Sequence, residues 1–192
     1  MIAIIKISKG PSTVLFPVPT VLVTSRLEGE EPNIITIAWT GTKSSEPPVV
    51  YISVRPMGRH SYRLIKESGE YVINIPSSDL TRQVDYCGTV SGKDVNKFKE
   101  TGLTPLPASQ VGAPLIAECP VNIECRVRQV LPLGSHDAFV ADVLTVHFNV
   151  DVLDERGRPD LKKIKPYGYC LHEYRSIGDK LGSYGYSRKD QG

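Results

Sequence analysis

The segment VNIECRVR, residues 121–128, alternates apolar and polar side chains at every position. Successive side chains of a strand point to opposite faces, so this pattern predicts a β-strand with one buried and one solvated face. Residues 138–152 form a second long strand candidate, and Gly134, Ser135 and His136 supply a turn between the two. This long hairpin favours a β-barrel over a parallel sheet.

The rest of the chain predicts short strands separated by turns and by a few short helices. The run VVYISV at residues 49–54 is rich in β-branched and aromatic residues, which favours a strand. Residues 41–48, rich in Gly, Ser and Pro, read as a loop. The expected strands are residues 20–26, 33–40, 49–54 and 71–75, and the expected short helices are residues 58–68, 79–86 and 94–98.

Length and charge limit the class of protein. The chain has 192 residues, 40% of them hydrophobic, which predicts a single domain over residues 1–192 with an extended C-terminal arm from about residue 165. Its net charge of +2 is too balanced for a dedicated nucleic-acid binder. It carries no run of about 18 apolar residues and no leader pattern, so we expect no membrane association and a cytoplasmic location.

The four cysteines and the remaining polar residues match no common catalytic motif. Cys87, Cys119, Cys125 and Cys170 lack CxxC or Cys/His spacing, which indicates free structural thiols rather than a zinc site or disulfides. The sequence also lacks GxSxG and HExxH motifs. We therefore expect no catalytic side chain and no metal ligand.

Polar groups that could bind a ligand gather around two of the expected strands, within residues 33–61. Arg59, His60 and Ser61 stand at the beginning of an expected helix, where cations, a hydroxyl and free backbone N–H groups could hold a phosphate. The same residues would also suit a solvated loop and helix cap, and the spacing is neither a P-loop nor GxGxxG.

A resemblance to a known family rests on the stretch PNIITIAWTGTKSSEPPVVYISVRPMGRHSYRLIKESGEYVINIP. It contains an Asn-x-x-Thr-x-x-Trp strand, a Ser-x-Pro-Pro turn and a basic-hydroxyl helix start, and Pro-Val-Pro precedes it at residues 17–19. The chain resembles flavin reductase-like proteins, especially their flavoredoxin branch, over about residues 11–175. The resemblance extends to Ser-Gly-Lys at residues 91–93 and Gly-Ser-His at residues 134–136.

The resemblance implies a mainly β fold, an FMN-binding split β-barrel of Greek-key type with a few short peripheral helices, which works as a homodimer. Asn33, Trp39 and Thr40 are similar to residues that border the flavin ring and ribityl chain, and His136 and Tyr167 to later contacts near the flavin. The phosphate end is matched by residues 59–61, with Lys93 as an additional cation. The implied cofactor-binding residues are Asn33, Trp39, Thr40, Ser53, Arg55, Arg59, His60, Ser61, Lys93, His136 and Tyr167.

Several of these residues have an ordinary structural alternative. Trp39 could be a core residue and Arg55 a solvated strand end. Lys93 could be a plain surface lysine, His136 a solvated turn residue and Tyr167 an aromatic turn anchor.

The implied activity is that of an FMN-binding redox protein, an NAD(P)H-dependent flavin or ferric reductase in which the cofactor carries the chemistry. NADH or NADPH would be the co-substrate, and a flavin, a ferric complex or a protein would accept the electrons. The alternative is a flavoredoxin-type electron carrier that is reduced by a protein donor. A third interpretation is a barrel that has lost its flavin and binds another ligand or partner.

Overall fold

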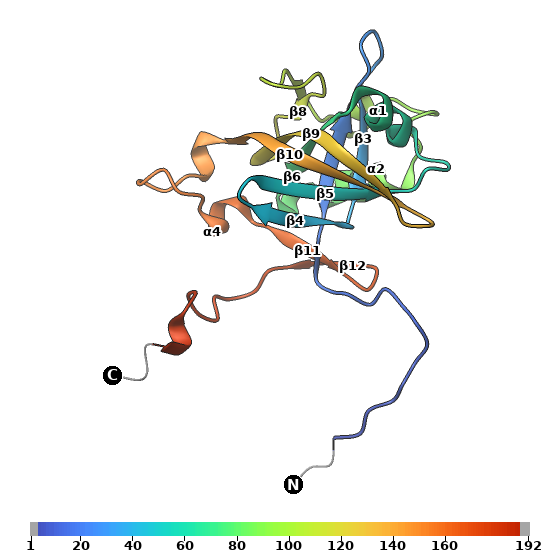
Figure 1. Cartoon of the computed structure of the whole chain (residues 1–192). Helices are drawn as coiled ribbons and strands as arrows, with labels where there is room; N and C mark the ends of the chain where they lie inside the picture. The colour runs from blue at the N-terminus through green and yellow to red at the C-terminus, as the bar shows by residue number, and fades with distance from the viewer. Residues whose placement is uncertain (1–3, 189–192) are drawn as a thin grey trace.

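A seven-stranded antiparallel sheet is the framework of the molecule (Figure 1). The computed structural model describes residues 4–188. The strand order is β3-β2-β6-β9-β10-β5-β4, and every neighbouring pair is antiparallel. The mainly β fold class is therefore confirmed. The strands are β2 (Val21–Ser25), β3 (Asn33–Ile37), β4 (Thr40–Ser45), β5 (Pro48–Val54), β6 (Glu70–Ile75), β9 (Val121–Pro132) and β10 (Asp137–Phe148).

The sheet curls until its two ends meet. The backbone N–H of Ser53 in β5 donates to the carbonyl of Trp39, just after β3, at 2.8 Å. This bond continues the pairing of β4 with β5, because Trp39 immediately precedes β4. β3 and β4 stand at opposite ends of the sheet order, yet only Ala38 and Trp39 separate them in the chain, so the sheet forms a partly open barrel. The β4–β5 pairing places Trp39 beside the end of β5.

The long hairpin of β9 and β10 has the predicted position but different bounds. β9 continues to Pro132, and β10 stops at Phe148 rather than residue 152. The strand is followed by a 3₁₀ helix, η2 (Val150–Val152). Val152 leaves the sheet here and packs in a separate apolar cluster with Val121 and Ile164.

The prediction of a loop at residues 41–48 was wrong, because most of it is the strand β4. β4 pairs with β5, with an irregularity in register between Thr42 and Ser44. It lies at the edge of the sheet, where small polar residues are tolerated because one side of the strand is not paired. Its Thr, Gly and Ser residues therefore carry little of the composition that identifies interior strands.

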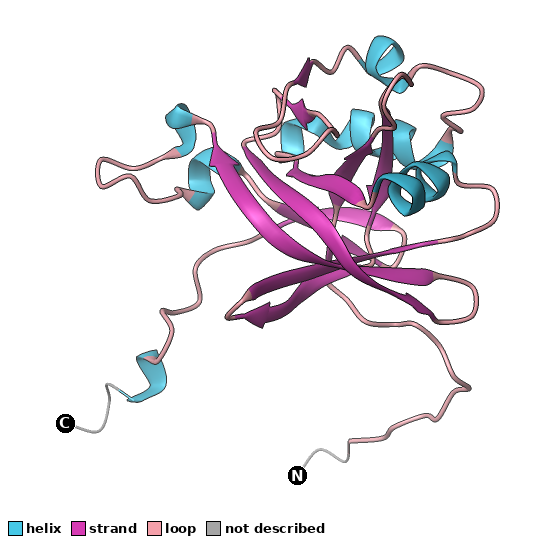
Figure 2. Ribbon diagram, turned by 45° about the horizontal axis from the view of Figure 1, so that its top comes forward, coloured by secondary structure: helices cyan, strands magenta, loops and turns pink. Residues whose placement is uncertain are grey.

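The helices lie outside the sheet (Figure 2). The helix expected from residue 94 begins later, because Asn96 is its N-cap and accepts a hydrogen bond from the Lys99 N–H. Gly69 ends the first helix in the left-handed conformation that favours glycine, with φ of 69°. The helices are α1 (His60–Ser68), α2 (Thr81–Thr89), α3 (Lys97–Thr101) and α4 (Leu161–Ile164), and η1 (Ser78–Leu80) precedes α2.

The C-terminal arm expected from residue 165 begins with regular structure. β11 (Tyr167–Cys170) and β12 (Glu173–Ser176) form a hairpin, and β1 (Val18–Pro19) pairs with β11. Within the expected arm, the chain leaves the barrel after β12, and this last segment carries the short η3 (Tyr186–Arg188) (Figure 1). The N-terminal segment also extends away from the barrel. Residues 189–192 of the expected arm lie outside the described residues.

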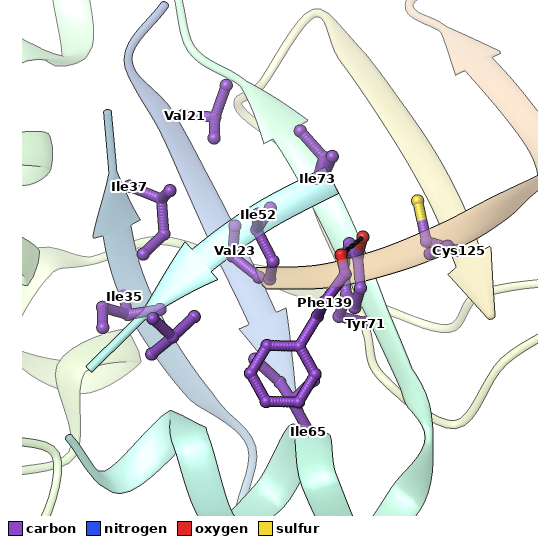
Figure 3. Packing of buried hydrophobic residues seen from close by; sticks show 12 residues of the cluster. Val21, Val23, Ile35, Ile37, Ile52, Ile65, Tyr71, Ile73, Cys125 and Phe139 are labelled. Atoms are coloured by element: carbon purple, nitrogen blue, oxygen red, sulfur yellow. Dashed lines mark hydrogen bonds between the residues drawn. The ribbon is translucent and has the colours of Figure 1, made fainter. Parts of the chain in front are cut away.

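Two apolar clusters pack on opposite faces of β2 and β3. The first fills the barrel and includes Tyr71 and Phe139, both fully buried (Figure 3). The second packs outside, where Leu22 and Ile34 meet α2, α3 and the two-stranded ribbon of β7 (Pro105–Leu106) and β8 (Leu115–Ile116). Within residues 4–188, no helix has the length and apolarity needed to span a bilayer.

Buried Glu124 on β9 holds the loop that follows β7. Its carboxylate accepts hydrogen bonds from the Ser109 N–H and hydroxyl, both at 2.8 Å, and from the Gln110 N–H at 2.6 Å. His147 Nε2 on β10 lies 2.6 Å from the same carboxylate. Burial alone would raise the pKa of Glu124, but these hydrogen bonds together lower it to about 2.

We expect Glu124→Gln to lower the free energy of unfolding at pH 7 by about 2 kcal/mol, the scale of a hydrogen bond to a charged group. Because the folded pKa of about 2 lies below the ordinary 4.5, the stabilisation is present above pH 4.5 and is lost as the pH falls toward 2. Urea unfolding at pH 7 and pH 3 checks this, with Glu28→Gln at an exposed position as control. An equal gap between wild type and Glu124→Gln at both pH values would contradict it.

Candidate functional site

A cleft of about 520 Å³ lies beside the point where the sheet closes. Its walls come from β3, the end of β5, α2 and the β11–β12 hairpin, with residues 12–15 along one side. Ligand sites in proteins usually have volumes of about 300 to 1,000 Å³. The side chains that line it outside residues 12–15 are Val18, Thr20, Ile35, Thr36, Ile37, Ala38, Trp39, Ser53, Val54, Arg55, Arg59, Asp85, Gly88, Thr89, His136, Tyr169, Leu171, His172 and Tyr174.

Trp39 and His136 form an aromatic pair at the cleft. Their ring centroids are 4.4 Å apart and the planes are tilted by 59°. Trp39 is 41% exposed, so it is not an interior core residue. The hydrogen bond from Ser53 to the Trp39 carbonyl fixes the backbone here, and the hairpin tip delivers His136 from β10.

A small recess adjoins the cleft and is lined by Asn33, His60, Ser61 and the backbone around Gly92. The Asn33 side chain donates to the Ser61 hydroxyl at 2.8 Å. Arg59, the N-cap residue of α1, lines both the recess and the cleft. The fold thus brings residues 59–61, at the start of α1, together with Asn33 of β3.

Eight of the eleven sequence-predicted site residues line the cleft or the recess, and three do not. Thr40 points to its own hairpin, where its hydroxyl donates to the Tyr51 carbonyl at 2.6 Å. Lys93 is exposed on the loop after α2. Tyr167 is buried in the outer apolar cluster, where burial raises the pKa of its phenol.

Lys97, which sequence reasoning missed, lines the recess as a buried cation. It is only 4% exposed, and its Nζ donates to the carbonyls of Ile34 at 2.8 Å and Cys87 at 2.7 Å. Burial, with a smaller contribution from the neighbouring Arg59 guanidinium, lowers the pKa of Lys97 to about 8. Nothing in its local sequence separates it from Lys99, because its burial depends on tertiary packing.

The cations of the site lack acidic partners. Within residues 4–188, none of Arg55, Arg59 and Lys97 forms an ion pair with a carboxylate. Burial, together with Arg55 and Arg59, lowers the pKa of His136. The acidic side chain in the cleft lining, Asp85, accepts a hydrogen bond from the Tyr174 hydroxyl at 3.0 Å. Uncompensated cations of this kind are suited to hold an anion.

The far end of the cleft is built by the β11–β12 turn, which the sequence did not single out. Leu171 and His172 form this turn with φ of 47° and 73°, a conformation that is uncommon for residues other than glycine. His172 Nδ1 lies 3.1 Å from the Tyr169 hydroxyl. Both rings, with Leu171 and Tyr174, face the cleft, so this turn contributes lining in place of the predicted Tyr167.

An unpartnered hydroxyl lies in the cleft wall. Thr20 is 4% exposed, and its Oγ1 has no hydrogen-bond partner in the described structure. A buried hydroxyl without a partner is unfavourable, so a polar ligand atom that reached it would be stabilised.

The family follows from the whole-chain comparison. The model of the family described as "Flavin reductase like domain" matches residues 13–178. The chain belongs to the flavin reductase-like family. The resemblance carried by the motif around Trp39 is therefore confirmed.

Solved flavoredoxins have the same fold as this flavin reductase-like chain. The flavoredoxin of Desulfovibrio vulgaris (Miyazaki F) is 33% identical, with a TM-score of 0.89 over 96% of this chain and 100% of that one. A flavoredoxin from Methanosarcina acetivorans is 27% identical, with a TM-score of 0.87 over 97% and 99% of the two chains. An uncharacterised protein of Pyrococcus abyssi is 36% identical over 87% of this chain and 94% of its own.

We expect Gly92→Ala to destabilise the recess, because a Cβ at Gly92 would overlap the Asn33 side chain that donates to Ser61. Overpacking of this kind costs about 1 to 3 kcal/mol of unfolding free energy. Urea unfolding measures it. Gly178→Ala is the control, since a Cβ there meets no atom within 4 Å. Equal stability of the two variants would show that the loop shifts freely.

Proposed function

We propose that the cleft binds FMN, with the flavin ring in the cleft and the phosphate beside Arg59 at the mouth of the recess, because the recess itself, at about 10 Å³, is smaller than a phosphate. The observation that carries the proposal is the pair formed by Lys97 and Arg59, two neighbouring cations without a carboxylate partner. They repel each other, and a phosphate between them would remove that repulsion and supply the missing counter-charge. The Ser61 hydroxyl and Asn33 amide stand beside them as hydrogen-bonding groups.

The shape and chemistry of the cleft fit a flavin. The exposed Trp39 ring and the Leu171 side chain offer apolar surface for a flat heteroaromatic ring. The unpartnered Thr20 hydroxyl offers a hydrogen bond to a polar ring edge. Arg59 borders both spaces, so one ligand could reach from the cleft to the recess.

We propose that the protein acts as an NAD(P)H-dependent flavin or ferric reductase. Bound FMN would supply the hydride-accepting chemistry, so no side chain of the protein has to act as acid or base. The protein would hold the phosphate through Arg59 and Lys97 and border the ring with Trp39 and His136. The exposed side of the Trp39 and His136 pair leaves room for a second planar molecule.

A second candidate function is that of an electron carrier reduced by a protein donor. The likeness to the flavoredoxin of Desulfovibrio vulgaris over nearly the whole of both chains favours it. The two functions share the cofactor site and differ in the use of NAD(P)H.

We expect the purified protein to show flavin absorbance after FMN is added, and NADH or NADPH to bleach it without oxygen. Bands that persist with both nucleotides would favour the carrier, and no bound flavin would exclude both functions. Lys97→Met should weaken FMN binding at least 10-fold, because it removes a charge-assisted contact of about 1.5 to 3 kcal/mol. The matched control is Lys93→Met, which removes the exposed lysine and should change binding less than twofold.

We also propose a homodimer, because both chain ends expose apolar side chains that find no cover within the described chain. Ile5 and Leu15 in the N-terminal segment are 86% and 81% exposed, and Leu181 near the other end is 94% exposed. Exposed apolar segments of this kind are typical of subunit contacts. Sedimentation should give twice the chain mass, and a monomer at micromolar concentration would contradict the proposal.

A further inference from the structure

We propose that Arg55, beside His136, forms a second anion subsite that recognises a phosphate group of the small molecule exchanging electrons at the flavin. This inference rests on the proposed function. It names the class of the second substrate, a phosphate-bearing dihydronicotinamide nucleotide, and the residue that selects it.

The position of Arg55 separates it from the recess. Arg55 directly follows Val54 of β5, which pairs with Asp137 of β10, so it stands next to the turn that carries His136. It lines the cleft but not the recess, whereas Arg59 lines both. Burial and then the charges of Arg55 and Arg59 lower the pKa of His136, and all three residues line the cleft.

Asp137, opposite Val54, and Asp85, in the cleft lining, are hydrogen-bonded to groups other than Arg55. Asp137 accepts a hydrogen bond from the Tyr62 hydroxyl, and Asp85 accepts one from the Tyr174 hydroxyl. Arg55 is exposed and forms no ion pair or side-chain hydrogen bond within residues 4–188. Its guanidinium is therefore free to receive a ligand at the mouth of the cleft.

The family resemblance includes Arg55 among the cofactor-binding residues, but the charge of the FMN phosphate does not require it. A phosphate monoester carries a charge of about −1.5 to −2 at pH 7. Arg59 and Lys97, which face the recess, already supply two positive charges. Arg55 is thus an additional cation, and a fork of guanidinium N–H groups suits a second phosphate.

The Trp39 and His136 pair fixes where the rest of that molecule would lie. The exposed Trp39 ring and the His136 ring next to Arg55 border the same part of the cleft. A nicotinamide ring stacked over the flavin there would place its attached phosphates toward solvent, within the reach of a long arginine side chain. A hydride donor without phosphate would gain nothing from Arg55.

The experiment compares three hydride donors by anaerobic stopped-flow on the FMN-loaded protein. They are NADH, reduced nicotinamide mononucleotide and uncharged N-benzyl-1,4-dihydronicotinamide. For Arg55→Ala, we expect the efficiency with NADH relative to the uncharged donor to fall at least 10-fold, mainly through KM, and Arg55→Lys to recover part of it. Reduced nicotinamide mononucleotide shows whether the phosphate next to the ribose is the group recognised.

Two variants serve as controls. Arg82→Ala removes an exposed charge of α2 outside the cleft lining and should keep the wild-type ratio. Arg59→Ala should instead lower FMN affinity. A ratio for Arg55→Ala equal to that of Arg82→Ala would overturn the subsite.

Failure of the proposed function has a different signature. If no donor reduces the wild-type flavin, the reductase function is wrong, and the subsite is then judged from calorimetric titration with NAD⁺. Binding that Arg55→Ala weakens at least 10-fold would support the subsite. Absence of NAD⁺ binding, or binding that Arg55→Ala leaves unchanged, would overturn it.

Discussion

The pairing of β9 with β10 is the constraint on which the rest of the structure depends. β6 pairs with β9 and β5 pairs with β10, so this one hairpin joins the two halves of the sheet. The strands of 12 residues each are long enough to carry both halves and to curl between them. That curl lets the chain pass from β3 directly into β4 through Ala38 and Trp39, which joins the two ends of the sheet. The cleft exists because of this closure, and its aromatic pair joins one residue from each side of it.

Charge without compensation is the second organising feature. Arg55, Arg59 and Lys97 come from the end of a strand, the cap of a helix and the first turn of another helix. The free-energy cost of an uncompensated charge is highest at the buried Lys97, whose ammonium group donates to two backbone carbonyls. A ligand phosphate would supply the missing charge, and this is the electrostatic argument for the proposed phosphate site.

Patterns that are local in the sequence predicted the local parts of the structure. The alternation at residues 121–128 correctly predicted a strand, but the expectation of a solvated polar face was wrong in part, because Asn122 and Glu124 are buried and Arg126 and Arg128 are exposed. The family motif predicted Trp39, Ser53, Arg55, Arg59 and His136 at the cleft, while β4 was missed because an edge strand does not need apolar residues. Lys97 was not predicted at the site and Tyr167 was predicted there but lies in the outer apolar cluster, since depth in the fold depends on how α3 and β11 pack. No spacing rule within the sequence encodes that depth.

The β11–β12 turn illustrates a conflict between folding and ligand choice. A two-residue turn with both φ values positive is best served by Asn and Gly, yet this chain places Leu171 and His172 there. Both side chains border the cleft, so the conformational strain of this turn lies at two residues that shape the cleft wall. Relatives that diverge at these two residues can therefore gain hairpin stability while they lose part of this wall. Replacement of Leu171 and His172 would thus raise the stability of the hairpin and, by the same change, remove side chains that line the cleft.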